Sequence, residues 1–436
     1  MKRALGALPL LLLGSAGWAR ADGGLPPWSD PGDLPVPTWA RSIVPFKNDQ
    51  VLQTMPDVSA SRRGGVTLGS RLPVYGARRG AGCEGRWWLV GPYAWLCSDA
   101  AELSVDEPSP PLLPASEGFL STLPPKVVGE GLPYRYFFVG KDGASGFRDL
   151  VHADEEAPDQ DFEAGFAVAI TEERVAHGER WGRTRNGEWI ALRELGEAHP
   201  ASFKGEDVSA SGSLDFAWVS PDRANVYAAP TASKVVGSRV HFEVVPWREE
   251  QAAPGGAMVR VSDDGAPAAW MRARDLLRPK LAPPPEDIGG AATQERWIDI
   301  ELASQTLVAY EGARPVYATL VSTGRGPVGS ESATPPGVHR IWVKLRSTNM
   351  GNLQNEDAEE HYSIEDVPYV QFFDKAVALH GAFWHRSFGH VHSHGCVNLA
   401  PADAAWLFGF TSPHVPAAWS AALPVRIEPG TTVRVR

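Results

Sequence analysis

The stretch HGAFWHRSFGHVHSHGCVN, residues 380–398, decides how the fold and chemistry of this chain are interpreted. It holds a single cysteine, Cys396, just after His394 and in the same segment as His380. A thiol attacks carbonyl carbons as the thiolate, which a neighbouring base can generate. Gly395 allows a sharp turn beside the thiol, so that backbone N–H groups can face a developing oxyanion. The stretch therefore predicts a thiol acyl-transfer site.

Short strands precede this stretch and predict a mainly β domain. Residues 297–302 alternate between apolar and charged side chains, which is typical of a half-buried strand. Residues 307–310 and 316–322 continue an antiparallel meander, and the apolar strand 376–379 ends at His380. We therefore expect the histidine to lie at a strand end that faces the cysteine loop.

The sequence after the cysteine predicts a helix and a further strand pair. Residues 401–408 begin with proline and carry aspartate in the first turn, as short helices do. Residues 425–427 and 433–435 predict a closing hairpin around Pro429-Gly430. Three acidic side chains of the domain are expected to be solvated strand or turn residues: Asp299, Glu301 and Asp374.

Two short motifs stand at the ends of the opening stretch: His380-Gly381 and Ser393-His394-Gly395-Cys396-Val397-Asn398. Together they resemble the signature of the L,D-transpeptidase catalytic-domain family. Three further segments are similar to that family: Thr334-Pro335-Pro336-Gly337, Val367-Pro368-Tyr369 and Asp403-Ala404. The resemblance covers residues 295–436 and implies a β-sandwich with short helices. The gap between the two motifs is short for the family, which affects the shape of the connecting loop.

The resemblance implies a cysteine-dependent acyl transfer on peptidoglycan stem peptides. Cys396 is the expected nucleophile, and His380 is the expected proton donor and acceptor. The backbone carbonyl of Gly381 is expected to orient the histidine ring. Because a free thiol has a pKa of about 8.5, we expect a cationic neighbour to favour the thiolate.

The rest of the second motif is expected to support the reaction. Backbone N–H groups around His394, Gly395 and Cys396 would form an oxyanion hole. His394 is too near the cysteine in sequence to be assigned as the base and has a supporting role. Ser393 and Asn398 are expected to hold the loop through side-chain hydrogen bonds. Neither a metal nor a cofactor is expected.

Other interpretations of the same residues remain open. Cys396 can be an inert core thiol. A zinc site can use the four residues His380, His390, His392 and Cys396, although the usual short cysteine pairs and His-Glu motifs are missing. We expect His385, His390 and His392 to be surface residues of the loop. The acidic residues 356–360 are a possible lid, and Tyr362 or Tyr369 either closes over the donor or packs within a strand.

Three functional hypotheses follow. The first is an L,D-transpeptidase whose acceptor is a stem-peptide amine or an amine of an outer-membrane-linking protein. The second is a carboxypeptidase or endopeptidase that uses the same acyl-enzyme with water as acceptor. The third is a wall-binding protein with a degenerate catalytic domain, against which the intact Cys396, His380 and His394 argue.

The N-terminus predicts export. Lys2 and Arg3 precede a mostly apolar run, residues 4–16, and Ala19-Arg20-Ala21 supplies small residues before a cleavage site at Asp22. No later segment has the eighteen uninterrupted apolar residues of a membrane span. We expect a protein of the periplasm or cell-wall space. Its net charge of −11 disfavours nucleic acid as a partner.

The three cysteines predict one disulfide. Cys83 and Cys97 flank a sequence that reads as a hairpin turning at Gly91-Pro92, so its ends would meet. A bridge there would stabilise the fold by about 3 kcal/mol. This pairing leaves Cys396 as a free thiol.

The 436 residues suggest about three domains, and abundant proline and glycine favour short strands and linkers. The order Gly-x-x-Leu-Pro-Val-Tyr, Gly-Arg-Trp-Trp-Leu-Val and Trp-Leu resembles bacterial SH3-like domains. The expected organisation is a signal peptide (1–21), a Pro-rich leader (22–60), an SH3-like module (61–106), a linker (107–130), a second β-rich module (131–205), a third SH3-like module (206–280), a linker (281–294) and the catalytic domain (295–436).

Overall fold

The computed structural model describes residues 32–109, 131–154, 157–231, 234–286, 288, 295–352 and 361–436. The expected signal peptide, most of the linker 107–130 and the acidic residues 356–360 lie outside these ranges. The described chain is mainly β, as predicted, with two α-helices, α1 (Val151–Asp154) and α2 (Pro401–Phe410). Neither helix is long and apolar enough to cross a membrane.

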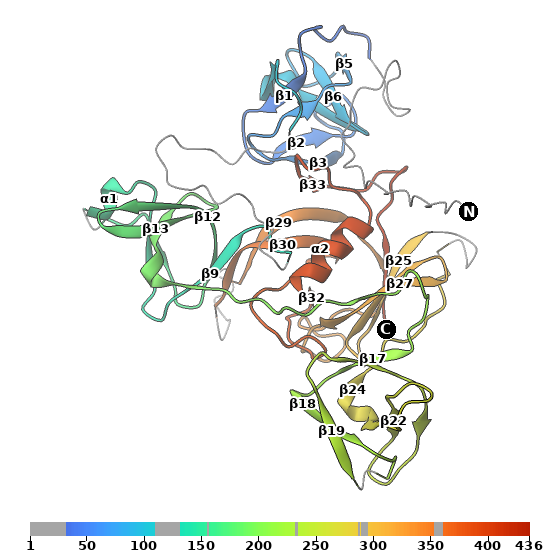
Figure 1. The fold of residues 1–436 in the computed structure, drawn as a ribbon. Helices are drawn as coiled ribbons and strands as arrows, with labels where there is room; N and C mark the ends of the chain where they lie inside the picture. Colours follow the sequence, from blue (N-terminus) through green and yellow to red (C-terminus); the bar gives the residue numbers. More distant parts are fainter. Residues whose placement is uncertain are drawn as a thin grey trace, which may run out of the picture.

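Three small β units surround a central C-terminal domain (Figure 1). The N-terminal unit contains β1 Ser42–Pro45, β2 Gln50–Gln53, β3 Arg62–Val66, β4 Leu72–Pro73, β5 Gly76–Arg78, β6 Trp87–Gly91, β7 Ala94–Cys97 and β8 Ala101–Ser104. The second unit contains β9 Arg135–Val139, β10 Ala144–Phe147, α1, β11 Gln160–Phe162, β12 Ala167–Ala176, β13 Glu179–Thr184, β14 Trp189–Ala191 and β15 Leu195–Glu197. The third unit contains β17 Phe216–Val219, β18 Arg223–Tyr227, β19 Val235–Val240, β20 Val244–Pro246, β21 Glu250–Gln251, β22 Met258–Arg260, β23 Trp270–Arg272 and β24 Leu276–Leu277.

The C-terminal domain begins with the predicted meander. It contains β25 Arg296–Glu301, β26 Thr306–Glu311, β27 Arg314–Ser322, β28 Gly337–Arg340, β29 Val343–Gly351, β30 Ser363–Asp374, β31 Val377–Gly381, β32 Val397–Leu399, α2, β33 Trp419–Ala422 and β34 Thr432–Val435. β25, β26 and β27 pair antiparallel in sequence order, which confirms the meander. The predicted closing hairpin is wrong, because β34 pairs in parallel with β25 and antiparallel with β28.

The N-terminal unit continues the sheet of the C-terminal domain. β3 pairs antiparallel with β33, so that Gly64 lies opposite Ala422. β1 and β2 belong to this unit although their residues were assigned to the leader, because Ile43 and Leu52 are buried in its core. The predicted hairpin forms from β6 and β7, and the Cys83–Cys97 disulfide is present. Whether these units are SH3-like stays a prediction.

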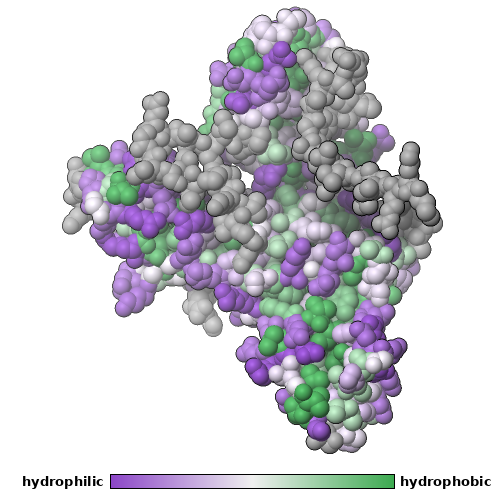
Figure 2. Space-filling view, viewed as in Figure 1, coloured by the Kyte–Doolittle hydropathy of each residue, from purple (hydrophilic) through white to green (hydrophobic). Residues whose placement is uncertain are grey.

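The third unit carries exposed apolar side chains. Figure 2 shows apolar side chains gathered over this unit, at the bottom of the view. Its strand β19 is paired with β18 and carries exposed valines, among them Val235 and Val236. The preceding β16 (Glu206–Asp207) does not join this unit but pairs with β27 of the C-terminal domain.

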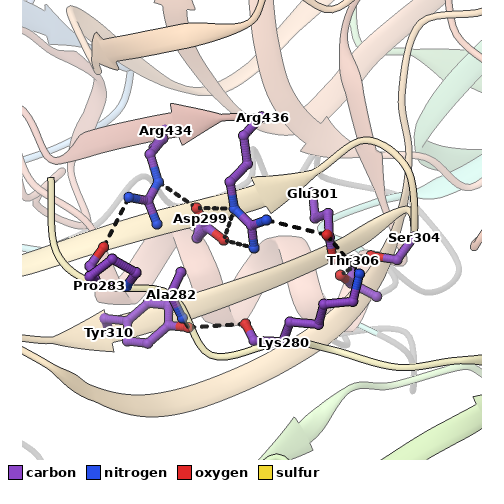
Figure 3. A network of polar contacts seen from close by, with 10 residues as sticks. All are labelled: Lys280, Ala282, Pro283, Asp299, Glu301, Ser304, Thr306, Tyr310, Arg434 and Arg436. Atoms are coloured by element: carbon purple, nitrogen blue, oxygen red, sulfur yellow. Dashed lines mark hydrogen bonds and ion pairs between the residues drawn. The ribbon is translucent and has the colours of Figure 1, made fainter.

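An ionic network around two buried carboxylates joins both ends of the C-terminal domain (Figure 3). Asp299 is 2% exposed and accepts hydrogen bonds from Arg434 at 2.6 Å and from Arg436 at 3.0 Å. Glu301 accepts from Lys280 at 3.0 Å. The two acidic residues were expected to be solvated, and that prediction is wrong because parallel β34 places the arginines directly beside β25. Asp374 is half-buried.

The chain just before the domain is bound to the same network. The hydroxyl of Tyr310 accepts a hydrogen bond from Ala282 N–H at 3.1 Å and lies 3.4 Å from Lys280 O. Arg434 donates to the carbonyl of Pro283 at 2.9 Å. The network therefore fixes residues 280–283 against β25 and β26 as well as pairing charges.

The substitution Asp299→Asn should lower the free energy of unfolding of the C-terminal domain by about 3 kcal/mol. The change removes a buried charge and leaves two guanidinium groups with weaker partners. Native-state hydrogen exchange of β25 and β34 amides measures the loss. Glu311→Gln is the control, because Glu311 pairs with the exposed side chain of Arg314 and should cost no more than about 0.5 kcal/mol. Equal losses for both variants would contradict this account.

Candidate active site

Strand pairing brings the two sequence motifs together. β31 pairs in parallel with β32, so that Leu379 lies opposite Val397 and His380 lies opposite Asn398. Leu379 and Val397 pack in the core beneath α2. Because side chains alternate along a strand, His380, Asn398 and the preceding Cys396 lie on the opposite face. The structure thus places the thiol and the histidine on one face of one sheet.

The Cys396 thiol lies in an apolar setting. It packs on a cluster that contains Val367, Val370 and Ala378, and its Sγ lies 3.8 Å from the carbonyl of Ala376. Burial raises the pKa of the thiol above its usual value, although the N–H of Ala378 acts in the opposite direction. The resting group is therefore a thiol at neutral pH.

His380 is buried, with 2% of its surface exposed. Its Nδ1 lies 3.3 Å from the carbonyl of Gly381, the contact expected from the family resemblance. The ring stacks on Trp384, with centroids 5.6 Å apart. Burial lowers the pKa of His380 to about 4, so the imidazole is neutral at pH 7. Since the Gly381 carbonyl can only accept, Nδ1 carries the proton and Nε2 keeps a free lone pair.

The pair differs from the expected ion pair. We expected a cationic neighbour to favour the thiolate, but burial keeps His380 neutral and Cys396 protonated. A neutral imidazole with a free Nε2 can instead remove the thiol proton as the reaction proceeds. The burial of both groups thus favours general-base activation over a preformed thiolate.

The loop before the thiol is held by side-chain hydrogen bonds. Ser393 Oγ accepts from Gly395 N–H at 3.2 Å and donates to the carbonyl of Cys396. Thr334 Oγ1 donates to the carbonyl of Gly395 at 2.7 Å. Gly395 has a φ of 126°, which a residue with a side chain rarely adopts. This turn depends on glycine and places the loop backbone beside the thiol.

His394 is exposed and turns toward Arg325. Its Nε2 lies 3.2 Å from Arg325 Nη2, and its ring stacks on Tyr362 with centroids 5.9 Å apart. Burial and the nearby Cys396 raise the pKa of Tyr362. Tyr362, with His394 stacked on it, therefore lies near the thiol, and His380 lies on the same face of the sheet as the thiol.

His385 is a site residue that the sequence interpretation missed. It was expected on the surface, but only 9% of it is exposed, and its Nε2 lies 2.9 Å from the Asn398 amide. Ser387 N–H donates to its Nδ1 at 3.2 Å, and burial lowers its pKa to about 3. No local pattern marks this residue, because its partner Asn398 lies across the loop. His390 is exposed, as expected, and His392 is half-buried.

The described residues do not support the zinc alternative. Ligand atoms of three or more His, Cys, Asp or Glu residues come within 4.8 Å of one another at a single place among them, formed by Cys83, Cys97 and Asp99. Two of those residues form the disulfide. His390 and His392 therefore do not join His380 and Cys396 in a metal-binding geometry.

The alkylation rate of Cys396 by iodoacetamide should rise steeply with pH and level off only above about pH 9. The reason is that partial burial raises the pKa of the thiol, and no cationic partner among the described residues lowers it. Cys396 is the only free thiol of the chain, so the label reports it directly. A small-molecule thiol provides the reference. A rate plateau between about pH 5 and 7 would reveal a thiolate–imidazolium pair and contradict this description.

Comparisons with known proteins agree with the motifs. Residues 295–435 match the family model YkuD, the L,D-transpeptidase catalytic domain. Similar solved structures include a cysteine-to-serine variant of Enterococcus faecium L,D-transpeptidase, with 23% identity, 33% of this chain and 50% of that chain covered and a TM-score of 0.25. An L,D-transpeptidase from Stackebrandtia nassauensis is 26% identical, with 35% of this chain and 60% of that chain covered and a TM-score of 0.23. An L,D-transpeptidase from Mycobacterium smegmatis is 16% identical, with 44% of this chain and 99% of that chain covered and a TM-score of 0.26. The matched part spans about half of the Enterococcus protein. No similar sequence was found among curated proteins.

Proposed function

From the match of residues 295–435 to the L,D-transpeptidase catalytic domain, we propose that this protein is an exported peptidoglycan L,D-transpeptidase. The observation that carries the proposal is the pairing of β31 with β32, which puts Cys396 and a neutral His380 on one face of the sheet. The predicted signal peptide supports a location in the periplasm or cell-wall space.

In the proposed acylation step, the Cys396 thiol attacks the donor peptide carbonyl. Nε2 of His380 takes the thiol proton as the sulfur–carbon bond forms. Backbone N–H groups of the cysteine loop stabilise the negative oxygen of the tetrahedral intermediate, except that of Gly395, which donates to Ser393 Oγ. The intermediate collapses, the peptide C–N bond breaks, and His380 returns the proton to the departing amine. The products are a thioester on Cys396 and the terminal residue of the donor stem.

In the second step, an acceptor amine attacks the thioester. His380 takes a proton from the amine and returns it to the sulfur as the carbon–sulfur bond breaks. The acceptor is a side-chain amine of another stem peptide or an amine of a protein linked to the outer membrane. With water in place of the amine, the same site would trim stems instead of joining them.

The roles of the neighbouring residues follow from their contacts. Gly381 O holds Nδ1 of His380 and so leaves Nε2 as the base. Ser393 and Thr334 fix the Gly395 turn that presents the backbone donors. His394, which is exposed beside the thiol, supports the site without acting as the base.

Purified wild-type protein incubated with disaccharide tetrapeptides should form dimers, which mass spectrometry separates from trimmed monomers. Cys396→Ala should reduce product formation by more than about 1,000-fold, because it removes the nucleophile. His380→Gln should reduce it by about 100- to 10,000-fold, because it removes the base. His152→Gln, at an exposed histidine of α1, is the matched control and should leave the rate unchanged.

Each result has a distinct meaning. Trimmed monomers in place of dimers would assign the protein to the hydrolytic alternative. Full activity of Cys396→Ala, or no product of either kind from folded wild-type protein, would refute the proposed acyl-enzyme.

A further inference from the structure

The loop that joins His380 to the second motif is held by parts of the chain outside the C-terminal domain. We propose that Tyr136 of the second unit is a positioning residue for His380 and acts through the rings of Phe383 and Trp384. The inference rests on the proposed function, since it concerns the base of that reaction. It gives the second unit a part in building the active site.

Stacked aromatic rings form a continuous path from the second unit to the base. Tyr136 stacks on Phe383, with centroids 3.9 Å apart and planes inclined by 25°. Phe383 meets Trp384 edge to face at 5.2 Å, and Trp384 stacks on His380 at 5.6 Å. Such pairs have preferred geometries, so a displaced ring displaces its neighbour.

Tyr136 is fixed at the other end of this path. It lies on β9, is 2% exposed, and donates its hydroxyl proton to the carbonyl of Asp366 on β30 at 2.6 Å. β9 pairs with β12, and Ala167 of β12 bridges in parallel to Ile364 of β30. The ring therefore belongs to a strand network that joins the second unit to the C-terminal domain.

A hairpin of the second unit strengthens this attachment. Asn186 donates to Glu365 at 2.7 Å, and Arg185 donates to Asp366 at 3.3 Å. Both acidic residues are buried. The contacts of the second unit with β30 thus include these two polar pairs and the hydrogen bond from the Tyr136 hydroxyl.

The two halves of the loop are held differently. The second half is bonded to β27 within the domain, because Gly389 N–H donates to Val321 O at 2.9 Å and His392 N–H donates to Thr323 O at 3.0 Å. In the first half, Ala382 N–H donates to Leu399 O, and the Phe383 ring packs in a cluster with Tyr136, Ala167 and Ala169 of the second unit. Trp384 follows and contacts both Phe383 and His380. The first half is the part that carries Phe383 and Trp384.

The segment between the second and third units holds the middle of the loop. Arg386 donates to the carbonyl of His199 at 2.9 Å. Phe203 stacks on Phe388 at 6.2 Å, and Gly205 N–H donates to the buried carboxylate of Asp403 at 2.9 Å. This segment is therefore fixed to the domain and limits how far the loop can move.

The position of His380 depends on this support because its ring makes one hydrogen bond within the described part of the chain, through Nδ1 to Gly381 O. Its remaining orientation comes from packing, and Trp384 provides the aromatic face. A general base that moves by about 1 Å can lose about 100-fold in rate. The second unit therefore influences the reaction without contacting the substrate.

The test compares Tyr136→Leu with Tyr136→Phe in the full chain. Tyr136→Leu should lower kcat for muropeptide transfer by about 10- to 100-fold, with KM within about twofold. Tyr136→Phe keeps the stacked ring and should restore kcat to within about threefold of wild type. Hydrogen exchange of the amides of residues 382–386 should accelerate in Tyr136→Leu and stay near wild type in Tyr136→Phe.

Phe162→Leu is the matched control, because it removes a buried aromatic ring from the core of the second unit away from the loop. It should change neither kcat nor exchange in residues 382–386. If Tyr136→Leu does not fold, the variant Phe383→Leu takes its place in the comparison, because it removes the ring on which Tyr136 stacks.

The outcomes separate this inference from the proposed function. If the wild type turns over substrate and Tyr136→Leu has the same kcat, the inference is overturned and the proposed function is not. Absence of turnover in wild type would overturn the proposed function, and loop exchange would still decide the inference. Unchanged exchange in Tyr136→Leu, or an equal change in Phe162→Leu, would show that Tyr136 does not position the loop.

Discussion

The parallel pairing of β31 with β32 is the constraint on which the site depends. A one-residue shift in this register would turn His380 or Cys396 to the opposite face, beneath α2. The pairing requires the chain to leave β31, cross the loop and return in the same direction. The loop contacts, the Gly395 turn and the packing of α2 all act to keep that return path in one place.

Burial determines the electrostatic state of the site. Both His380 and Cys396 are neutral because the sheet face is apolar and no charged group pairs with either of them among the described residues. Cys396 therefore stays a protonated thiol, which is a weak nucleophile, and the neutral imidazole of His380 can accept its proton. His385 extends this neutral setting, since it is buried, uncharged and bonded to the Asn398 amide that lies opposite His380.

The sequence predicted the parts of the molecule that local patterns encode. The meander, the β31 strand, the helix after the cysteine and the Cys83–Cys97 bridge all follow from alternation, turn residues and cysteine spacing. The sequence-based prediction was wrong where the interaction partner of a side chain lies on a strand far away in the chain. Asp299 and Glu301 look solvated by alternation, but parallel β34 brings arginines to them. His385 looked like a loop residue because its partner is defined only by the fold, and the contacts of Tyr136 with Phe383 join segments far apart in the chain.

The most direct test of the account is the mass of the protein after treatment with a carbapenem, whose strained amide carbonyl can acylate the thiol. The account predicts an increase equal to the mass of the whole drug, because ring opening retains every atom, and peptide mapping should place the adduct on Cys396. Folded protein that gains no mass, or that carries the adduct on another residue, would contradict the central claim that Cys396 forms an acyl-enzyme.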